Sequence, residues 1–234
     1  MRALILILIC LVCPQMSAAD VLRVSAAASL KGPLDQAVTE FEAQTGHSVR
    51  VSYAASSLLA RQIVQGAQAD VFWSANQVWI EYLSDQGVII ETAAPLRNGI
   101  ALASNQTLGS DIAALCETGR IVTARTDAVP LGQYVKSALS ASGDWPLPSG
   151  CLVETDNARA ALIAVLRGEV AAGFLYSSDI AQNGLTTVSV LDPPEPVLYP
   201  IASLSPAGAE ISAFLQSDAG LRPFLTVGFQ ANDR

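Results

Sequence analysis

Two stretches near the start of the chain, LRVSAAASL at residues 22–30 and VRVSYAASSL at residues 49–58, share one pattern. Each runs from an extended, partly apolar segment into a serine, Ser29 or Ser56, that is expected to open a helix. A serine N-cap sets a hydroxyl beside several backbone N–H groups that lack partners, at the positive end of the helix. This arrangement holds an oxyanion without a charged side chain. Serine also caps helices that bind no ligand, so either turn alone fits both interpretations, but the pair suggests a site for a dianion.

Strand and helix patterns alternate along the rest of the chain. Runs of apolar residues indicate strands, and apolar residues at helical spacing, closed by glycine or opened by proline, indicate helices. The expected strands are 22–25, 48–53, 69–73, 99–103, 121–124, 170–176 and 198–203, and the expected helices are 30–45, 58–64, 78–83, 129–139, 158–166, 207–216 and 221–227. Such alternation predicts an α/β fold with helices on both faces of a mostly parallel sheet.

Two breaks divide the chain into lobes, one near Pro95 and one at the proline-rich LDPPEP of residues 191–196. We expect two doubly wound, mostly parallel sheets, with residues 20–95 and 198–234 in lobe 1 and residues 96–197 in lobe 2. Ligands of such sheets bind beyond the carboxyl ends of the strands. The ligand cleft is therefore expected between the lobes, at strand-to-helix turns that contain Ser29, Ser56, Pro130 and Asp156.

Residues 1–19 have the features of a secretory signal peptide. Arg2 supplies the positive end, residues 3–12 are apolar, and small residues precede an expected cleavage near Ala19. A lipoprotein is the alternative, with Cys10 or Cys13 lipidated, but the residue before each cysteine is larger than expected there. The prediction is an exported, periplasmic protein.

The charge of the chain excludes several classes of partner. The formal net charge is −8, or −9 without Arg2, and no cluster of basic residues is present. An acidic chain of this kind is not expected to bind nucleic acid or an anionic membrane surface. A small anionic ligand remains compatible, because backbone dipoles act locally while distant charges are screened by salt. With 51% hydrophobic residues, the chain is expected to form a well-packed globular protein. We also expect it to act as a monomer.

Removal of the signal peptide would leave two cysteines, Cys116 and Cys151. In an exported chain they are expected to form a disulfide, which would close a loop of 34 residues and stabilise the fold by about 3–4 kcal/mol. Two buried thiols are the alternative. The single histidine, His47, and the lack of a Cys-rich or His-rich motif argue against a bound metal cation. No cofactor is expected.

Five short motifs follow one another along the chain: AAASL (26–30), ASSLLARQ (55–62), GAQADVF (66–72), VPLGQY (129–134) and GFLYSSD (173–179). Together they resemble the periplasmic molybdate-binding proteins of ABC importers, in order and over residues 22–229. Each motif alone is weak, but the ordered set is specific for that family. The resemblance implies a two-lobed periplasmic binding fold that closes on molybdate or tungstate and delivers it to a permease in the inner membrane.

The resemblance also implies a ligand set. In the family, two serines at the first two helix starts hold the oxyanion, and they fall on Ser29 and Ser56. Backbone N–H groups at two further helix starts fall on Leu131 and Ala158, and a tyrosine hydroxyl after an apolar strand falls on Tyr176. The family usually has Ala where Leu131 stands and often Val where Ala158 stands, which affects the shape of the pocket more than its hydrogen bonds.

A set of three hydroxyls and several backbone N–H groups suits molybdate, a dianion whose oxygens only accept hydrogen bonds. It disfavours hydrogen phosphate, whose O–H needs an acceptor. Sulfate is also an acceptor-only dianion, so binding of sulfate stays open as an alternative function. An organic acid would call for an arginine clamp on its carboxylate, and the predicted helix starts contain none.

Several residues near these motifs have other expected roles. Ser57 is an alternative ligand to Ser56. Arg61 and Arg159 are expected on helix surfaces or between the lobes, paired with acids such as Asp70 or Asp156. The remaining expectations are packing for Phe72, Trp73 and Trp79, and a cap after Ser178 for Asp179.

A secreted serine hydrolase is the last alternative, with Ser29 or Ser56 as the nucleophile. The chain has no Gly-x-Ser-x-Gly motif, and its only histidine, His47, is distant in sequence from both serine turns. The prediction is therefore a binding protein without catalytic residues rather than an enzyme.

Overall fold

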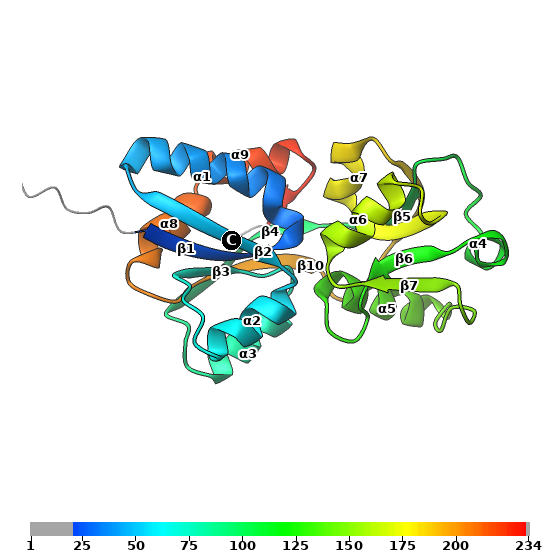
Figure 1. Ribbon diagram of the computed structural model, residues 1–234, viewed down its shortest axis with the longest axis horizontal. Coiled ribbons are helices and arrows are strands. Elements are labelled where there is room, and N and C mark those ends of the chain that lie inside the picture. Colours follow the sequence, from blue (N-terminus) through cyan, green and yellow to red (C-terminus); the bar gives the residue numbers. More distant parts are fainter. Residues whose placement is uncertain (1–20, 233–234) are drawn as a thin grey trace, which may run out of the picture.

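The computed structural model describes residues 21–232, which form two α/β lobes lying side by side (Figure 1). Lobe 1 contains a six-stranded sheet of order β11-β4-β10-β3-β1-β2. Its strands are β1 (Val21–Ala27), β2 (Ser48–Ala54), β3 (Val71–Trp73), β4 (Glu91–Asn98), β10 (Val197–Ser203) and β11 (Gln230–Ala231). Its helices are α1 (Lys31–Thr45), α8 (Gly208–Leu215) and α9 (Asp218–Thr226) on one side of the sheet, and α2 (Ser56–Val64) and α3 (Val78–Asp85) on the other (Figure 1).

Lobe 2 contains a five-stranded sheet of order β7-β6-β8-β5-β9. Its strands are β5 (Ile100–Ser104), β6 (Ile121–Ala124), β7 (Leu152–Thr155), β8 (Ala172–Tyr176) and β9 (Thr186–Leu191). Helices α6 (Ala158–Leu166) and α7 (Ser177–Asn183) lie on one side of this sheet, α5 (Pro130–Ser142) lies on the other, and α4 (Ile112–Thr118) lies at the end far from lobe 1 (Figure 1). The predicted two-lobed α/β architecture is confirmed.

Both sheets are mixed, whereas mostly parallel sheets were expected. Strand β1 runs parallel to β2 and β3, but β10 is antiparallel to β3 and β4. In lobe 2, β6 is parallel to β7 and β8, but β5 is antiparallel to β8 and β9. The chain passes between the lobes twice, from β4 to β5 and from β9 to β10. These four strands pair antiparallel because a parallel pair needs a crossover connection within its own sheet, which a segment passing to the other lobe does not supply.

Local sequence signals set the ends of several helices. Gly46 ends α1 in the left-handed conformation, with φ of 75°, as its missing Cβ allows. Pro130 is the first residue of α5, where the lost N–H costs little. The N-cap of α6 is Asn157, the residue after Asp156, and its side-chain oxygen accepts a hydrogen bond from Ala160 N at 3.0 Å.

Aromatic side chains fill the core of lobe 1 beside the site. Trp73 is fully buried against Phe224, with ring centroids 4.9 Å apart, and its indole N–H donates to the carbonyl of Tyr199 at 3.0 Å. Phe72 and Trp79 are also buried, so the predicted packing role of these aromatic residues is confirmed.

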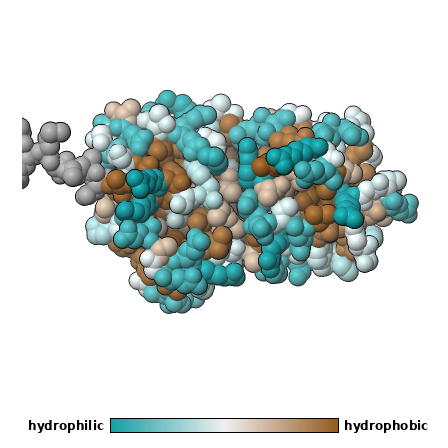
Figure 2. Space-filling view, viewed as in Figure 1, coloured by the Kyte–Doolittle hydropathy of each residue, from teal (hydrophilic) through white to brown (hydrophobic). Residues whose placement is uncertain are grey.

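The two lobes contact one another directly. The 3-10 helix η1 (Ala28–Leu30) of lobe 1 lies against α6 of lobe 2. The Asn76 amide donates to Gln133 Oε1 in α5 at 2.9 Å, and Asn98 Nδ2 donates to Ser178 Oγ at 2.8 Å. In the space-filling view the lobes touch along their boundary, and apolar residues form patches separated by hydrophilic ones (Figure 2).

A disulfide joins Cys116 to Cys151, which confirms the predicted pairing. The bond links α4 to the residue just before β7, and the two Cα atoms are 5.0 Å apart. The carbonyl of Cys151 also accepts a hydrogen bond from Ile121 N, so the crosslink is anchored to the edge of the lobe 2 sheet.

Replacing both cysteines with alanine should therefore lower the free energy of unfolding by about 3 kcal/mol, because the open chain gains conformational entropy when it unfolds. Urea denaturation of the purified, ligand-free protein measures the change. Reduction of the wild type should reproduce most of it. Ligand affinity should stay within about twofold, since α4 lies at the far end of lobe 2 (Figure 1). Equal stability of the variant and the wild type would contradict the prediction.

The predicted signal peptide, residues 1–19, and the alternative lipidation sites Cys10 and Cys13 lie outside the described residues. None of the helices within residues 21–232 combines the length and the hydrophobicity that crossing a bilayer requires. Over the same range, no group of three or more His, Cys, Asp or Glu side chains is arranged to hold a metal ion.

Candidate ligand-binding site

A small cavity at the lobe boundary brings together all five residues that the sequence resemblance singles out. It contains about 210 Å³ of empty space, part of which is open to solvent. Lobe 1 contributes residues from the ends of β1 and β2, from the turns that follow them and from the loop after β3. Lobe 2 contributes the starts of α5 and α6 and the end of β8. The lining residues are Ala27, Ala28, Ser29, Ala54, Ala55, Ser56, Ala75, Val129, Pro130, Leu131, Asn157, Ala158 and Tyr176.

Ser29 does not cap a helix, contrary to the expectation from its position. The N-cap of η1 is Ala27, and Ser29 is the second residue of that helix. Its side chain is buried, and its Oγ lies 3.1 Å from the hydroxyl of Tyr199 in β10. The hydroxyl is therefore used in a tertiary contact next to the cavity rather than in a local cap.

Ser56 departs from the expected cap in the same way. The N-cap of α2 is Ala55, and Ser56 is the first helical residue. Its Oγ accepts a hydrogen bond from the backbone N–H of Ala75 at 3.0 Å, across the cavity wall. Ser57, the alternative ligand, is buried but does not line the cavity, so the geometry favours Ser56.

Lobe 2 supplies two helix starts and a tyrosine hydroxyl. Leu131 and Ala158 lie in the first turns of α5 and α6, where backbone N–H groups lack intrahelical partners. Tyr176 ends β8 with its side chain buried, and its hydroxyl has no hydrogen-bond partner among the described residues. Burial raises the pKa of Tyr176 well above its ordinary value, so the hydroxyl stays protonated and can donate.

The cavity lining contains no carboxylate, lysine or arginine. Tyr176 is its only titratable side chain. The side-chain oxygen of Asn157 is already engaged by Ala160 N. The cavity therefore offers hydroxyls and the partial positive charge of several helix starts, which is the chemistry of an anion site built from donors.

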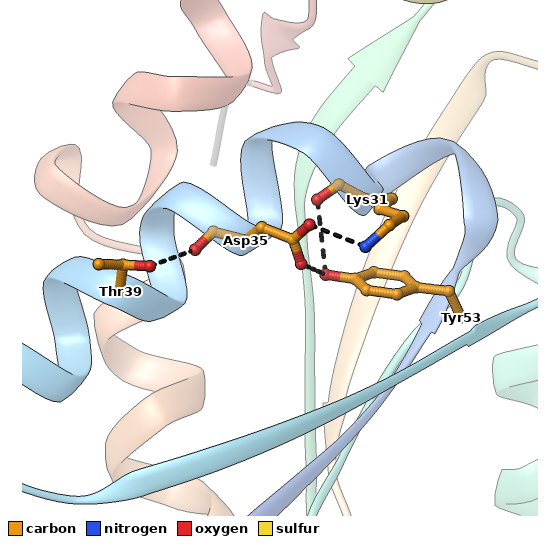
Figure 3. Close-up of polar contacts among 4 residues, drawn as sticks. All are labelled: Lys31, Asp35, Thr39 and Tyr53. Atoms are coloured by element: carbon orange, nitrogen blue, oxygen red, sulfur yellow. Dashed lines mark hydrogen bonds and ion pairs between the residues drawn. The ribbon is translucent and has the colours of Figure 1, made fainter.

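A polar cluster joins α1 to the end of β2 (Figure 3). Tyr53, near the end of β2, donates its hydroxyl to Asp35 Oδ1 at 2.6 Å, and Lys31 Nζ contacts Asp35 Oδ2 at 2.9 Å. The Lys31 ammonium also lies 4.6 Å from the centroid of the Tyr53 ring. Burial, with Asp35 as the next cause, raises the pKa of Tyr53, which keeps this hydroxyl a donor. The cluster joins the first turn of α1, which follows Ser29, to the strand that precedes Ser56 (Figure 3).

Comparison with known proteins places this arrangement in a family. A family model described as bacterial extracellular solute-binding protein matches residues 22–230. The chain belongs to this family. The Escherichia coli molybdate-binding protein ModA is 34% identical to it over 195 residues, covering 77% of this chain and 76% of the relative. This relative is a binding protein, not an enzyme, and the family assignment places the present chain in the same class.

Solved structures show the same fold for this solute-binding protein. The periplasmic molybdate-binding protein of Azotobacter vinelandii has a TM-score of 0.78 at 22% identity, covering 91% of this chain and all of the other. The sulfate-binding protein SubI of Mycobacterium tuberculosis has a TM-score of 0.77 at 14% identity, covering 91% and 87%. The fold alone therefore does not identify the anion, and the choice rests on the site.

The expected ion pairs of the two arginines near the site are wrong. Arg61 lies over the ring of Trp79, 5.1 Å from its centroid, and not against Asp70. The Asp70 carboxylate instead accepts hydrogen bonds from Arg23 N and from Ser205 Oγ, at 2.8 and 2.7 Å. Arg159 is exposed and forms no ion pair with Asp156 among the described residues.

The geometry also argues against the hydrolase alternative. His47 follows the C-terminal end of α1, and its Nε2 lies 3.3 Å from Glu210 Oε2 of α8. It does not line the cavity that holds Ser29 and Ser56. Neither serine therefore has an imidazole base among the groups that surround it.

Sequence reasoning missed Tyr199 and Ala75, which contact the two serine hydroxyls from behind. Tyr199 follows the proline-rich crossing in an apolar strand, where the sequence does not distinguish a site residue from a core residue. Ala75 acts through its backbone N–H, for which no side chain gives a signal.

Proposed function

We propose that this protein captures molybdate or tungstate between its lobes and delivers it to the permease of an ABC importer. The observation that carries the proposal is the convergence of Ser29, Ser56, Leu131, Ala158 and Tyr176 on one small cavity without an ionised side chain. The relative named molybdate-binding protein ModA supports the choice of anion.

Each of these residues has a role in the proposed complex. The hydroxyls of Ser29, Ser56 and Tyr176 donate to the oxyanion, and so do the backbone N–H groups of Leu131 and Ala158. All oxygens of molybdate accept, so a set of donors satisfies the ligand without a counter-charge. Hydrogen phosphate would bring an O–H that finds no carboxylate or other acceptor-only side chain in the lining.

We also propose that ligand binding is coupled to closure of the lobes. The proposed lobes are residues 20–95 with 198–234, and residues 96–197. Their boundaries lie close to the end of β4 at Asn98 and the start of β10 at Val197. The hydrogen bond from Asn76 to Gln133 joins the lobes beside the cavity and would form only when they close.

Export to the periplasm, with signal cleavage near Ala19, is part of the proposal, as are action as a monomer and the lack of a nucleic-acid partner. The disulfide between Cys116 and Cys151 supports an oxidising compartment. The net charge of −8 supports the lack of a nucleic-acid partner.

Calorimetric titration of the ligand-free mature protein with molybdate, tungstate, sulfate and hydrogen phosphate tests the proposal. Tight binding of the first two anions with little heat from the others is expected. Tight sulfate binding with weak molybdate binding would assign the protein to sulfate transport instead. No binding of any of the four would overturn the oxyanion function.

Ser29→Ala and Ser56→Ala should each weaken molybdate binding by about tenfold or more, because each removes a hydrogen bond to a charged ligand. Ser57→Ala is the matched control, since Ser57 is buried next to Ser56 but lies outside the cavity lining. Its affinity should stay within about twofold of the wild type. Titration calorimetry of the three variants measures the effect, and unchanged affinity in both site variants would contradict the ligand assignment.

A further inference from the structure

The hydroxyl of Tyr199 contacts Ser29, one of the proposed ligand residues, from outside the cavity lining. Tyr199 belongs to β10 and is completely buried, and its Oη is 3.1 Å from Ser29 Oγ. It does not line the cavity itself. Any effect of its hydroxyl on a bound anion therefore passes through neighbouring side chains, and Ser29 is the one at a hydrogen-bond distance of 3.1 Å.

The tyrosine is held in place from several sides. Its carbonyl accepts the indole N–H of Trp73 at 3.0 Å. Its ring packs edge-on against Phe229 and Tyr176, with centroids 5.0 and 5.6 Å away. Its hydroxyl also interacts with the side chains of Asn98 and Tyr176. The hydroxyl therefore occupies a fixed position relative to Ser29.

The number of protons on the two hydroxyls determines the direction of their hydrogen bond. Burial raises the pKa of Tyr199, so its hydroxyl keeps its proton. Ser29 has a single proton, and a charged oxyanion is a stronger acceptor than a neutral hydroxyl. When Ser29 donates its hydrogen bond to the anion, the hydrogen bond between the two hydroxyls can persist only with Tyr199 as the donor.

Ser56 shows the same arrangement with a different donor. Its Oγ accepts from Ala75 N, so its own proton is free to point into the cavity. Each serine hydroxyl thus has a second contact: Ser56 with the backbone N–H of Ala75, and Ser29 with the side chain of Tyr199. Only the contact to Ser29 can be removed by a point substitution.

We propose that Tyr199 is a positioning residue of the anion site, which donates to Ser29 Oγ and thereby turns the Ser29 proton toward the bound oxyanion. This inference rests on the proposed function, because it needs a dianion in the cavity. Tyr199 itself does not touch the ligand.

Tyr199→Phe removes the hydroxyl and keeps the ring. The variant should bind molybdate about three- to tenfold more weakly, because Ser29 is no longer held in its donating orientation. In a Ser29→Ala background, adding Tyr199→Phe should weaken binding clearly less than it does in the wild type, since the contact to Ser29 is gone and only the one to Tyr176 remains near the cavity. In a Ser56→Ala background the full effect of Tyr199→Phe should persist. Calorimetric titration of the wild type and the five variants completes both cycles.

Stability gives a second, independent measurement. Ser29→Ala removes one of the partners of the Tyr199 hydroxyl, so adding Tyr199→Phe should lower the free energy of unfolding less in the Ser29→Ala background than in the wild type. An equal loss of affinity in all three backgrounds, or no loss in Tyr199→Phe, would overturn the positioning role. A wild type that binds neither molybdate, tungstate nor sulfate would instead overturn the proposed function, so the two failures are distinguishable.

Discussion

Gly132→Ala will disrupt both the fold of lobe 2 and the anion site. Gly132 is the third residue of α5, directly after Leu131, and a Cβ on it would overlap the backbone carbonyl oxygens of Ala124 and Arg125. Backbone atoms at the end of β6 cannot move aside without breaking the sheet, so the start of α5 must shift instead. We expect a loss of at least about 3 kcal/mol in the free energy of unfolding, at the upper end of the range for overpacking.

The same shift should weaken anion binding by at least about a hundredfold, because the Leu131 N–H moves with the helix and closure of the lobes no longer aligns the donors. Urea denaturation and calorimetric titration with molybdate measure the two effects. Gly109→Ala is the control, since no atom lies within 4 Å of a Cβ at that exposed loop position. Near-native affinity in Gly132→Ala would contradict the predicted effect of this displacement on the anion site.

The position of the site could be predicted because it depends on local patterns. A strand followed by a small residue and a helix start can be recognised in a few consecutive residues, and the sequence contains four such turns. The structure brings Ser29, Ser56, Leu131 and Ala158 from these turns to one cavity, with Tyr176 at the end of a fifth strand. Ordinary α/β topology places the ends of the strands at the same edge of each sheet.

The roles of the serine hydroxyls could not be predicted in the same way. Serine favours the N-cap in isolated helices, but Ala27 and Ala55 take those positions here. The two hydroxyls instead contact Tyr199 and Ala75, which are 170 and 19 residues away in the sequence. Contacts of this kind depend on the tertiary arrangement, and no local preference encodes them.

The predictions of strand direction and of ion pairs failed for a related reason. Segment β4 contains a proline and alternates weakly, so it was not predicted as a strand, and with it the antiparallel return of β10 was missed. The partner of Arg61 is an aromatic ring that the fold brings beneath it, not the nearest acid in the sequence.

Asp179 is the clearest case in which burial was not visible in the sequence. It was expected to cap a helix after Ser178, but α7 begins at Ser177 and Asp179 lies within its first turn. The side chain is buried, and its Oδ2 has no hydrogen-bond partner among the described residues. Burial raises the pKa of Asp179 to about 7, and the charge of Arg159 opposes the shift only in part.

This buried carboxyl should make the ligand-free protein less stable as the pH rises from about 4 to about 7. The folded state keeps the Asp179 proton up to about pH 7, whereas the unfolded chain releases it above its ordinary pKa of 3.8. The folded state therefore binds more protons across this interval, so its stability falls with increasing pH, and above pH 7 the penalty stays constant. Asp179→Asn cannot ionise and escapes the penalty. Its stability relative to the wild type should rise by about 2–3 kcal/mol between pH 5 and pH 8.

Urea denaturation of both ligand-free proteins at pH 5, 6, 7 and 8 measures this difference, and all other titrating groups cancel because the two chains share them. Asp85→Asn removes the same formal charge from the exposed end of α3 and should change stability by less than about 0.5 kcal/mol at each pH. If the stability of Asp179→Asn and the wild type differed by a constant amount from pH 5 to pH 8, Asp179 would have to be ionised in the folded protein throughout. The charge of Arg159, which acts on Asp179, would then have to compensate the buried carboxylate.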